Sequence, residues 1–348
     1  MQRVRACRER LDLPYAPSNG DGLLAGTAGS VLPSRLGAPQ VFVSLIEDEV
    51  CGFMLVQRDD ARYRWTLAAA GAGSSRLDAT EEACIELWSA LAEHVALRAG
   101  QSGVRRIFAA VRDGSAAHDS LCAVAFVAYG QAIVMRGRWI DDGAPQPAGF
   151  REQHASDVWS IHQLYHRSVP RTVQFAEALT SEEWALPGRR ERLPFIGTGY
   201  REHSFVMDSD EGVCVYARVT RRRGAAHLNF MIQPDCGVQL EPFFSAALRC
   251  SGVGRRDSVT VCVHGFVRES VSAFQELGLT VNEERTLLVK HTTAPAVVRA
   301  ELAPLPSLRR HERRAVRRVP SLMQGQVAIA ELKARMRATI TESECELV

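Results

Sequence analysis

Residues 50–56, VCGFMLV, return in outline as VCVYARV at residues 213–219. In both places a second strand-like run follows, RWTLAA at 64–69 and HLNFMI at 227–232. The later runs correspond in the same order, 107–111 with 259–263 and 125–126 with 278–279. Internal repetition on this scale predicts two related domains in tandem.

Composition fits a folded protein of two ordinary domains. The chain has 348 residues, 46% of them hydrophobic and 24% charged, and its net charge of +2 excludes a general polyanion-binding surface. Its nine cysteines are scattered singly, without a CxxC pair, as in reducing compartments. No apolar run approaches the roughly 20 residues of a membrane span. Because the charged N-terminus also lacks the apolar core of a signal peptide, the sequence predicts a cytoplasmic protein.

The first half reads as a mixed α/β unit. Two runs of β-branched and aromatic residues, at about 41–46 and 50–58, flank the acidic turn Glu47-Asp48-Glu49 and predict a hairpin. Thr80 is the expected N-cap of a helix that ends at Gly100. The other expected elements are a strand at 62–70, a strand at 104–111, a helix at 115–124 and a strand at 126–135.

The second half begins with more helix than the first. Val158, Ile161 and Tyr165 share one face of an expected helix, and another helix is expected at 172–179. The order of the first half then returns, with strands at 203–208, 212–221 and 225–232, a helix at 239–250, a strand at 258–264, a helix at 267–277 and a strand at 279–290. We therefore expect a first domain at 1–139, a linker at 140–149, a second domain at 150–298 and a tail at 299–348.

The two copies differ in length by 10 residues. Cys51 corresponds to Cys214, an offset of 163, whereas Phe126 corresponds to Leu279, an offset of 153. The extra residues of the first copy fall between its third strand and its last helix. We place most of them in the Gly-rich loop at 71–80.

The tail carries a cluster of arginines between residues 309 and 318, followed by an expected helix at 326–339. On a helix, four of these arginines share one face and can contact the phosphates of nucleic acid or of anionic lipid. A solvated or partner-binding tail is the alternative, because no aromatic side chain interleaves with the arginines. For the rest of the chain, nucleic acid is not an expected partner.

The order of antiparallel strands, helix, strand, helix and strand, closing on FQELGL at residues 274–279, resembles the fold of the Gcn5-related N-acetyltransferases, the GNAT superfamily. HLNFMI at 227–232, with Gln233-Pro234 after it, is similar to the family's central strand and the start of its acyl-CoA loop. The resemblance covers about residues 41–136 and 150–291. It implies two tandem GNAT-like acyl-CoA N-acyltransferase folds, of the α/β class with a mixed sheet, packed as an intramolecular pseudo-dimer.

The resemblance also implies an acyl-CoA-dependent N-acyltransferase, which uses acetyl-CoA or another acyl-CoA and a small-molecule or peptide amine as acceptor. In the family, pantetheine lies in the gap, or splay, where two neighbouring central strands diverge. The loop amides before the next helix hold the pyrophosphate, because free N–H groups and the helix dipole attract an anion. Carried onto matching positions, these roles fall on Met231 and Ile232 for pantetheine and on Cys236, Gly237, Val238 and Gln239 for the phosphates.

Both copies depart from the family at its two functional features. The second loop has a single glycine, no arginine in register, and two carboxylates, Asp235 and Glu241, whose charge opposes phosphate binding. The first loop, at 71–76, is small enough but out of register. Leu121 and Phe274 stand where the family often has the tyrosine that protonates the leaving thiolate. A catalytically inactive GNAT-like binding or scaffold protein is therefore the alternative function.

Two further groups of polar residues are candidates for the functional site. Histidines on the expected strands of the second half can act as a general base near neutral pH, or can be ordinary hydrogen-bonded strand residues. These histidines are His203, His227, His264 and His291. Tyr216, Arg218 and Asn229 either line the substrate side of the splay or face solvent. No metal-ligand motif is present in the sequence.

Overall fold

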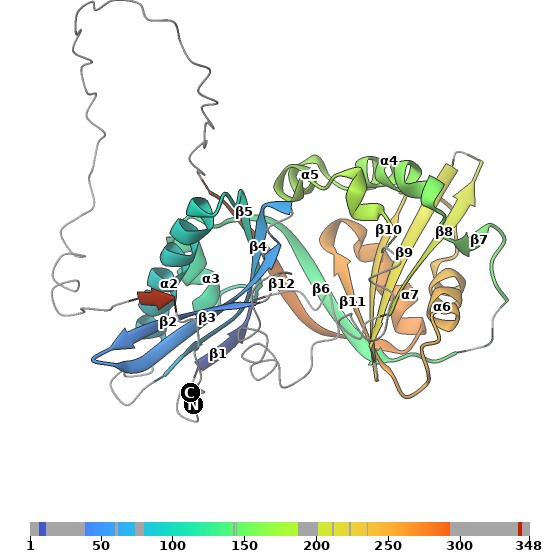
Figure 1. The fold of residues 1–348 in the computed structure, drawn as a ribbon. Coiled ribbons are helices and arrows are strands. Elements are labelled where there is room, and N and C mark those ends of the chain that lie inside the picture. The colour runs from blue at the N-terminus through green and yellow to red at the C-terminus, as the bar shows by residue number, and fades with distance from the viewer. Residues whose placement is uncertain are drawn as a thin grey trace, which may run out of the picture.

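Every strand of the described chain joins one mixed sheet of 13 strands, with helices packed against it (Figure 1). The computed structural model describes residues 7–11, 39–59, 62–73, 80–141, 143, 145–186, 201–210, 212–222, 224–234, 236–292 and 340–342. The first half contains β1 (Cys7–Arg10), β2 (Gln40–Ile46), β3 (Glu49–Asp59), β4 (Arg64–Ala72), α2 (Glu81–Gln101), β5 (Arg106–Val111), α3 (Ala116–Ala123) and β6 (Val127–Arg138).

The second half opens with short helices before it repeats this order. The first element is the strand β7 (Phe150–Glu152). The helices that follow it are η3 (Ala155–Asp157), α4 (Val158–Ser168), α5 (Arg171–Glu177) and η4 (Ser181–Trp184). Then come β8 (Arg201–Ser209), β9 (Gly212–Arg222), β10 (Ala225–Ile232), α6 (Leu240–Cys250), β11 (Ser258–His264), η5 (Gly265–Ser270), α7 (Val271–Glu276) and β12 (Leu279–His291). All the strands and helices expected between residues 41 and 290 are present, within a few residues of their expected ends.

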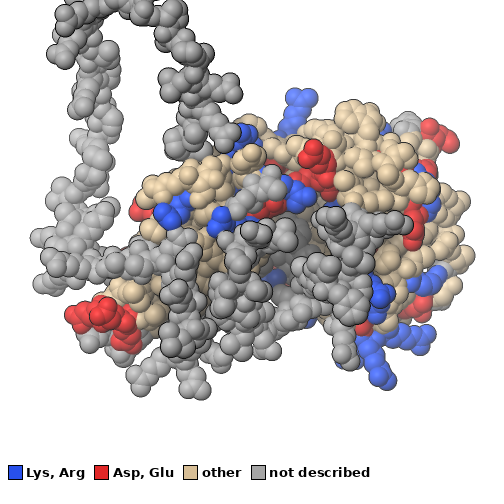
Figure 2. Space-filling model, viewed as in Figure 1, with Lys and Arg blue, Asp and Glu red and all other residues tan. Residues whose placement is uncertain are grey.

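Local sequence signals account for the first elements. Glu47 and Asp48 have φ angles of 47° and 64°, the conformation of a two-residue hairpin turn whose twist suits the flanking strands. Acidic side chains gather at this end of the β2–β3 hairpin (Figure 2). The side chain of Thr80 accepts a hydrogen bond from the backbone N–H of Ala83, so the expected N-cap of α2 is confirmed.

The difference in length between the two copies lies in a helix, and its placement in the loop at 71–80 is wrong. Helix α2 has 21 residues, whereas its counterpart α6 has 11. The apolar face of α2 runs from Cys84 to Ala99, so every added turn buries more surface against the first half's sheet. The loop before the helix is nearly the same length in both copies, at residues 73–80 and 233–239.

The two halves exchange their last strands. β6, the last strand of the first half, lies between β11 and β12 of the second half. In return, β12 lies between β5 and β6 of the first half. Neither strand pairs with a described strand of its own half, and the antiparallel β6–β12 pair is the seam of the continuous sheet (Figure 1).

The exchanged strands also complete each other's hydrophobic cores. Leu288 of β12 is buried in the core of the first half together with Trp65 and Leu91. Ile133 and Met135 of β6 are buried in the core of the second half. Each such side chain stabilises the folded state by roughly 2 kcal/mol, so the exchange binds the halves through packing as well as through backbone hydrogen bonds.

The turn that leads into each exchanged strand has the same shape. Ala125 before β6 and Gly278 before β12 have φ angles of 63° and 86°. Their N–H groups donate to Cys122 O and Gln275 O at the ends of the preceding helices. A left-handed residue at this position is a common way to end a helix, and alanine adopts it only at a cost. The repeated sequence therefore conserves a backbone conformation even where glycine has been replaced.

Only a short piece of the tail is described. β13 (Ile340–Glu342) pairs antiparallel with β2 at the edge of the sheet. The arginine cluster and the helix expected at 326–339 lie outside the described residues, and the division of the chain at 140–149 stays a prediction. Among the described helices, none combines the length and the apolar character that a membrane span requires. The cytoplasmic location stays a prediction as well.

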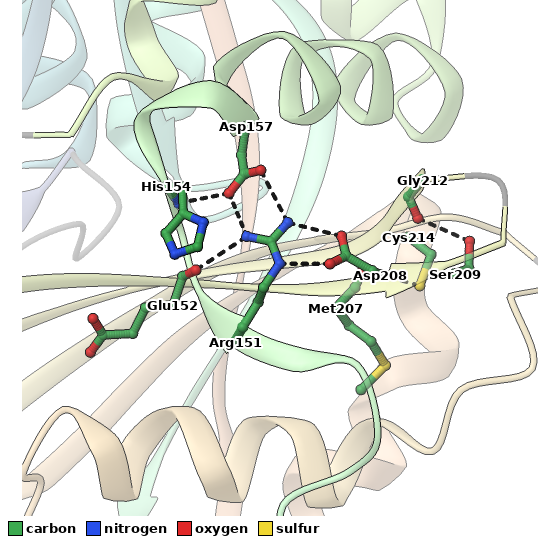
Figure 3. Close-up of polar contacts among 9 residues, drawn as sticks. All are labelled: Arg151, Glu152, His154, Asp157, Met207, Asp208, Ser209, Gly212 and Cys214. Atoms are coloured by element: carbon green, nitrogen blue, oxygen red, sulfur yellow. Dashed lines mark hydrogen bonds and ion pairs between the residues drawn. The ribbon is translucent and has the colours of Figure 1, made fainter.

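A charged cluster fastens the start of the second half to its sheet (Figure 3). Arg151 of β7 donates from Nη1 to Asp157 Oδ2 and from Nε to Asp208 Oδ2, both at 2.6 Å. The backbone N–H of His154 also donates to Asp157 at 2.6 Å. The Arg151 guanidinium and this amide hold the pKa of Asp157 below its usual value. One arginine thus joins β7, the first turn of the helical segment and the end of β8.

Arg151→Met is expected to lower the free energy of unfolding by about 2 kcal/mol at neutral pH, because a largely buried carboxylate loses its partner. Since the pKa of folded Asp157 is lowered, this contribution is complete above the unfolded carboxyl pKa of about 3.9. It disappears as the pH falls through the folded value. Urea unfolding at pH 7 and in acid measures both effects.

Arg268→Met is the matched control for that experiment. Arg268 and Glu284 form an ion pair at 3.0 Å in which both side chains are more than half exposed. Its removal is expected to cost less than about 0.5 kcal/mol. Equal losses from the two substitutions would contradict a structural role for the Arg151 cluster.

Candidate functional site

The two parallel strands at the centre of the second half separate part-way along their length. β10 and β11 pair from Ala225 with Ser258 to Leu228 with Val261, and no further. β9 continues beside β10 as far as Ile232, and β6 continues beside β11 as far as His264. The result is a V-shaped opening in the sheet. Met231 and Ile232 lie on the arm of this opening that β10 forms.

The loop that leaves this arm presents backbone amides in front of α6. Gly237 is exposed and has a φ of 62°, and a Cβ placed there would meet nothing within 4 Å. Within the described residues, the N–H groups of residues 236–239 donate to no backbone carbonyl. Gln239 precedes α6 without a side-chain cap, so the helix start adds its positive dipole end. Glu241 in the first turn adds the opposing charge expected from the sequence.

The equivalent opening in the first half is filled by its own chain. β4 and β5 pair only over residues 64–66 and 106–108 before they separate. β1 pairs antiparallel with residues 69–72 of β4 in the gap. The buried residue after it bridges both arms: Leu11 N donates to Ala68 O at 3.0 Å, and Ala110 N donates to Leu11 O at 2.7 Å.

Contacts with two other elements, β12 and α3, hold this segment in place. Arg285 of the exchanged strand β12 is buried, and its Nη1 donates to Arg10 O at 2.7 Å and to Ala110 O at 2.9 Å. Its Nη2 lies 2.9 Å from a carboxylate oxygen of Glu283. The carboxylate of Glu9 accepts from Ala117 N, at 3.2 Å, in the first turn of α3. The first opening is therefore closed by packing, backbone pairing and charge.

A cavity of about 450 Å³ lies against the second opening, between the two halves. Asn229 and Met231 line it from β10, and Cys262 and His264 line it from β11, so both arms of the opening reach it. The first half contributes residues of β3, β4, β5 and β6, and the helical segment of α4, α5 and η4 covers it. Figure 1 shows this segment along the edge of the molecule where the halves meet.

Glu177, the last residue of α5, stands in this cavity with a raised pKa. Burial raises the pKa of its carboxyl to about 7, although Arg64 and the hydroxyl of Tyr165 favour the ionised form. Tyr165 Oη donates to Glu177 Oε2 at 3.2 Å. Burial raises the pKa of Tyr129 and Tyr165, which therefore keep their protons at neutral pH.

The two arginines in the cavity are already engaged. Arg64 Nε lies 3.0 Å from Asp59 and its Nη2 lies 3.4 Å from Glu183. Arg218 donates from Nε to Tyr216 Oη at 2.8 Å and lies 3.3 Å from Glu202. Its Nη2 also donates to Glu183 O at 3.0 Å. Pairs drawn from both halves thus fix the charged part of the wall.

The polar strand residues proposed from the sequence reach the cavity. Tyr216, Arg218 and Asn229 all line it, because alternate residues of β9 and β10 face the same side of the sheet.

The four histidines divide into buried and peripheral pairs. Burial lowers the pKa of His227 and of His264 to about 4, so both are neutral at pH 7. Of the two, His264 lines the cavity. His203 and His291 lie against the rings of Phe205 and Phe175. Of these four histidines, the one that lines the cavity is therefore neutral at pH 7.

Both openings follow from one arrangement. In each half, a parallel pair inside a mixed sheet separates part-way, and a helix connects its two strands. Antiparallel strands flank the pair, and a helix and a last strand follow it. Each half is a GNAT-like unit. The fold expected from the resemblance is confirmed, with a strand exchange that the resemblance does not include.

Comparison with known proteins finds similar solved structures at low identity. No family model matches the sequence, and no curated protein matches it. A tandem GNAT protein from the clavulanic acid biosynthesis pathway is 14% identical, with 83% of this chain and 100% of that chain covered and a TM-score of 0.47. A GCN5-related N-acetyltransferase from Sphaerobacter thermophilus is 12% identical, with 75% and 84% covered and a TM-score of 0.47.

A third similar structure is a putative acetyltransferase of the GNAT family from Novosphingobium aromaticivorans. It is 13% identical, with 68% of this chain and 89% of that chain covered, and its TM-score is 0.41.

Leu121 and Phe274 are buried in the cores of the two GNAT-like units, so neither position supplies a hydroxyl. The structure instead places two tyrosine hydroxyls, those of Tyr129 and Tyr165, in the cavity between the units, and the sequence did not indicate either as a site residue. The sequence did not indicate Glu177 either. Part of the cavity wall around it comes from the first unit, and the sequence of α5 does not reveal that contact. An acidic residue at the end of a short helix is the only signal that its sequence offered.

Proposed function

We propose that the chain is an acyl-CoA-dependent N-acyltransferase that uses acetyl-CoA or another acyl-CoA. The cofactor occupies the opening of the second GNAT-like unit, and an amine acceptor occupies the cavity beside it. One observation carries the proposal: Asn229, Met231, Cys262 and His264, from both arms of the opening, line a cavity large enough for a small molecule. A thioester held in the opening therefore faces the space that an acceptor can enter.

The residues of the second unit fit such a cofactor through their backbone. Met231 and Ile232 offer an unpaired strand edge to pantetheine, and residues 236–239 offer amides to phosphate. Bound acyl-CoA would supply the activated carbonyl that a neutral amine attacks: a C–N bond would form as the C–S bond breaks, and coenzyme A would leave as the thiol with the proton that the amine gives up. Tyr129 and Tyr165 line the same cavity and keep their hydroxyl protons at neutral pH.

Acetyl-CoA is expected to bind the wild-type chain, and Gly237→Val is expected to weaken binding at least tenfold. Gly237 has a φ of 62°, which a β-branched residue adopts only under strain, so the loop must change shape. Isothermal titration of both proteins with acetyl-CoA measures the difference. No detectable heat from the wild type at about 1 mM ligand would remove the proposal.

Gly224→Val controls for backbone strain in that titration. Gly224 has a φ of 80° in the turn between β9 and β10, and nothing lies within 4 Å of a Cβ placed there. The substitution is equally strained but lies at the opposite end of β10 from the α6 loop. We expect it to lower stability and to leave the affinity for acetyl-CoA unchanged.

A non-catalytic GNAT-like binding or scaffold protein is the second candidate function. Glu241 beside the phosphate position and the buried Leu121 and Phe274 favour it. For the first unit it is the better proposal, because β1 already occupies the opening there. Binding of acetyl-CoA without transfer to any amine in a broad acceptor screen would favour this function for the whole chain.

A further inference from the structure

The cavity between the GNAT-like units has an excess of negative charge. Among its described lining residues, the acids are Asp59, Glu177 and Glu183, and the bases are Arg64 and Arg218. Arg64 pairs with Asp59 and Glu183, and Arg218 pairs with Glu202. Glu177 has no ion pair within the described part of the chain, and its hydrogen-bond partner is the neutral hydroxyl of Tyr165. One carboxylate is thus left to receive a cation.

Aromatic rings make up much of the remaining wall. They come from β5, β6, α4, η4, β9, β10 and η5, and they are Phe108, Tyr129, Tyr165, Trp184, Tyr216, Phe230 and Phe266. Ring faces bind apolar groups and also attract cations, by about 0.5 to 2 kcal/mol for each contact. A wall of this kind suits a ligand with an apolar or aromatic body.

From this we propose that the cavity selects a primary amine on an apolar or aromatic body without a carboxylate group, and that Glu177 binds its ammonium. That the ligand is the acyl acceptor rests on the proposed function. The binding site itself depends only on the cavity and its charges.

The same charges disfavour an amino acid as ligand. A carboxylate needs a free cation, but both arginines of the wall already have carboxylate partners, and His264 is neutral at pH 7. It would also meet the repulsion of Glu177 and Glu183. Loss of a buried charge partner is costly, so discrimination between an amine and its amino acid is expected to be at least tenfold.

Binding is expected to depend on pH through Glu177. The groups that face it are Tyr165 on α4, Tyr129 on β6, Arg64 on β4 and Glu183 on η4. Burial raises the pKa of the two tyrosines, so both stay neutral between pH 6 and pH 8. Because the pKa of Glu177 is about 7 and only its ionised form pairs with ammonium, affinity is expected to be about tenfold higher at pH 8 than at pH 6.

The test uses the full chain without acyl-CoA and three probes of one shape: 2-phenylethylamine, phenylalanine and 3-phenylpropionate. Ligand-observed NMR titration is expected to show binding of the amine alone. Glu177→Gln keeps the size of the side chain and is expected to weaken amine binding about tenfold at pH 8 and to abolish its pH dependence. Glu93→Gln, on the exposed face of α2, is the matched control and is expected to change neither.

Several outcomes would overturn the proposal. They are no binding of the amine at about 10 mM, equal or tighter binding of either carboxylate probe, or unchanged pH dependence in Glu177→Gln with its melting temperature preserved. None of these outcomes requires acyl-CoA. Amine binding without acetyl-CoA binding would therefore remove the proposed function and leave this site, and the reverse result would remove this site alone.

Discussion

If the chain is divided at the linker, neither half is expected to fold without the other. In a first-half fragment, β6 keeps none of its strand partners, because β11 and β12 both belong to the second half. The edge of β5 also loses β12, and the first core loses Leu288. Unpaired backbone groups and exposed apolar side chains together cost more than the typical stability of a domain, about 5 to 15 kcal/mol.

Residues 1–143 and 144–348, produced alone and together, provide the measurement. Each fragment alone is expected to show no cooperative thermal transition, whereas the co-expressed pair is expected to co-purify and to melt as one particle. Cleavage of the intact folded chain at the same place is the control, and it is expected to leave both pieces associated. A first-half fragment that is monomeric and melts cooperatively would show that β6 can fold back beside β5.

Leu11→Asp is expected to lower the free energy of unfolding by about 4 kcal/mol. Leu11 is 1% exposed and lies in the core of the first unit, where a carboxylate loses its hydration. The substitution also weakens the bridge that Leu11 forms between Ala68 and Ala110. Chemical unfolding with a near-ultraviolet probe measures the loss.

Leu97→Asp is the matched control, because Leu97 on α2 is 59% exposed. It is expected to cost less than about 1 kcal/mol, mostly through helix propensity. The filled opening has a second consequence, since acetyl-CoA is expected to bind with a stoichiometry of one per chain. A stoichiometry of two, or equal losses from the two aspartate variants, would mean that β1 does not occupy the opening in solution.

The repeated runs at 50–56 and 213–219 were enough to predict two units and the order of their strands. Alternation along β9 and β10 also placed Tyr216, Arg218 and Asn229 on one face, so part of the cavity wall was within reach of the sequence. These features are local, and they depend on periods of two and 3.6 residues that the sequence carries directly.

The sequence did not predict the strand exchange or the filling of the first opening by β1. A last strand has the same pattern whether it pairs with its own half or with the other, and the turns at Ala125 and Gly278 have the same shape in both cases. The segment CRERL at 7–11 carries three charged residues in succession, and its place in the first unit depends on Arg285 and β4. Glu177 faces the other unit across the cavity, so its raised pKa depends on the assembled walls.

The seam between β6 and β12 also sets an order of events during synthesis. β6 ends at Arg138 and β12 ends at His291, so about 150 more residues must be made before β12 is complete. At roughly 5 to 20 residues per second, the first half waits about 10 to 30 s before β12 can complete its sheet. During that interval the edge of β5 and the apolar side chains of β6 are open to other chains. The nascent first half is therefore a natural client for a chaperone, and slower translation of the second half is expected to lower the yield of folded protein.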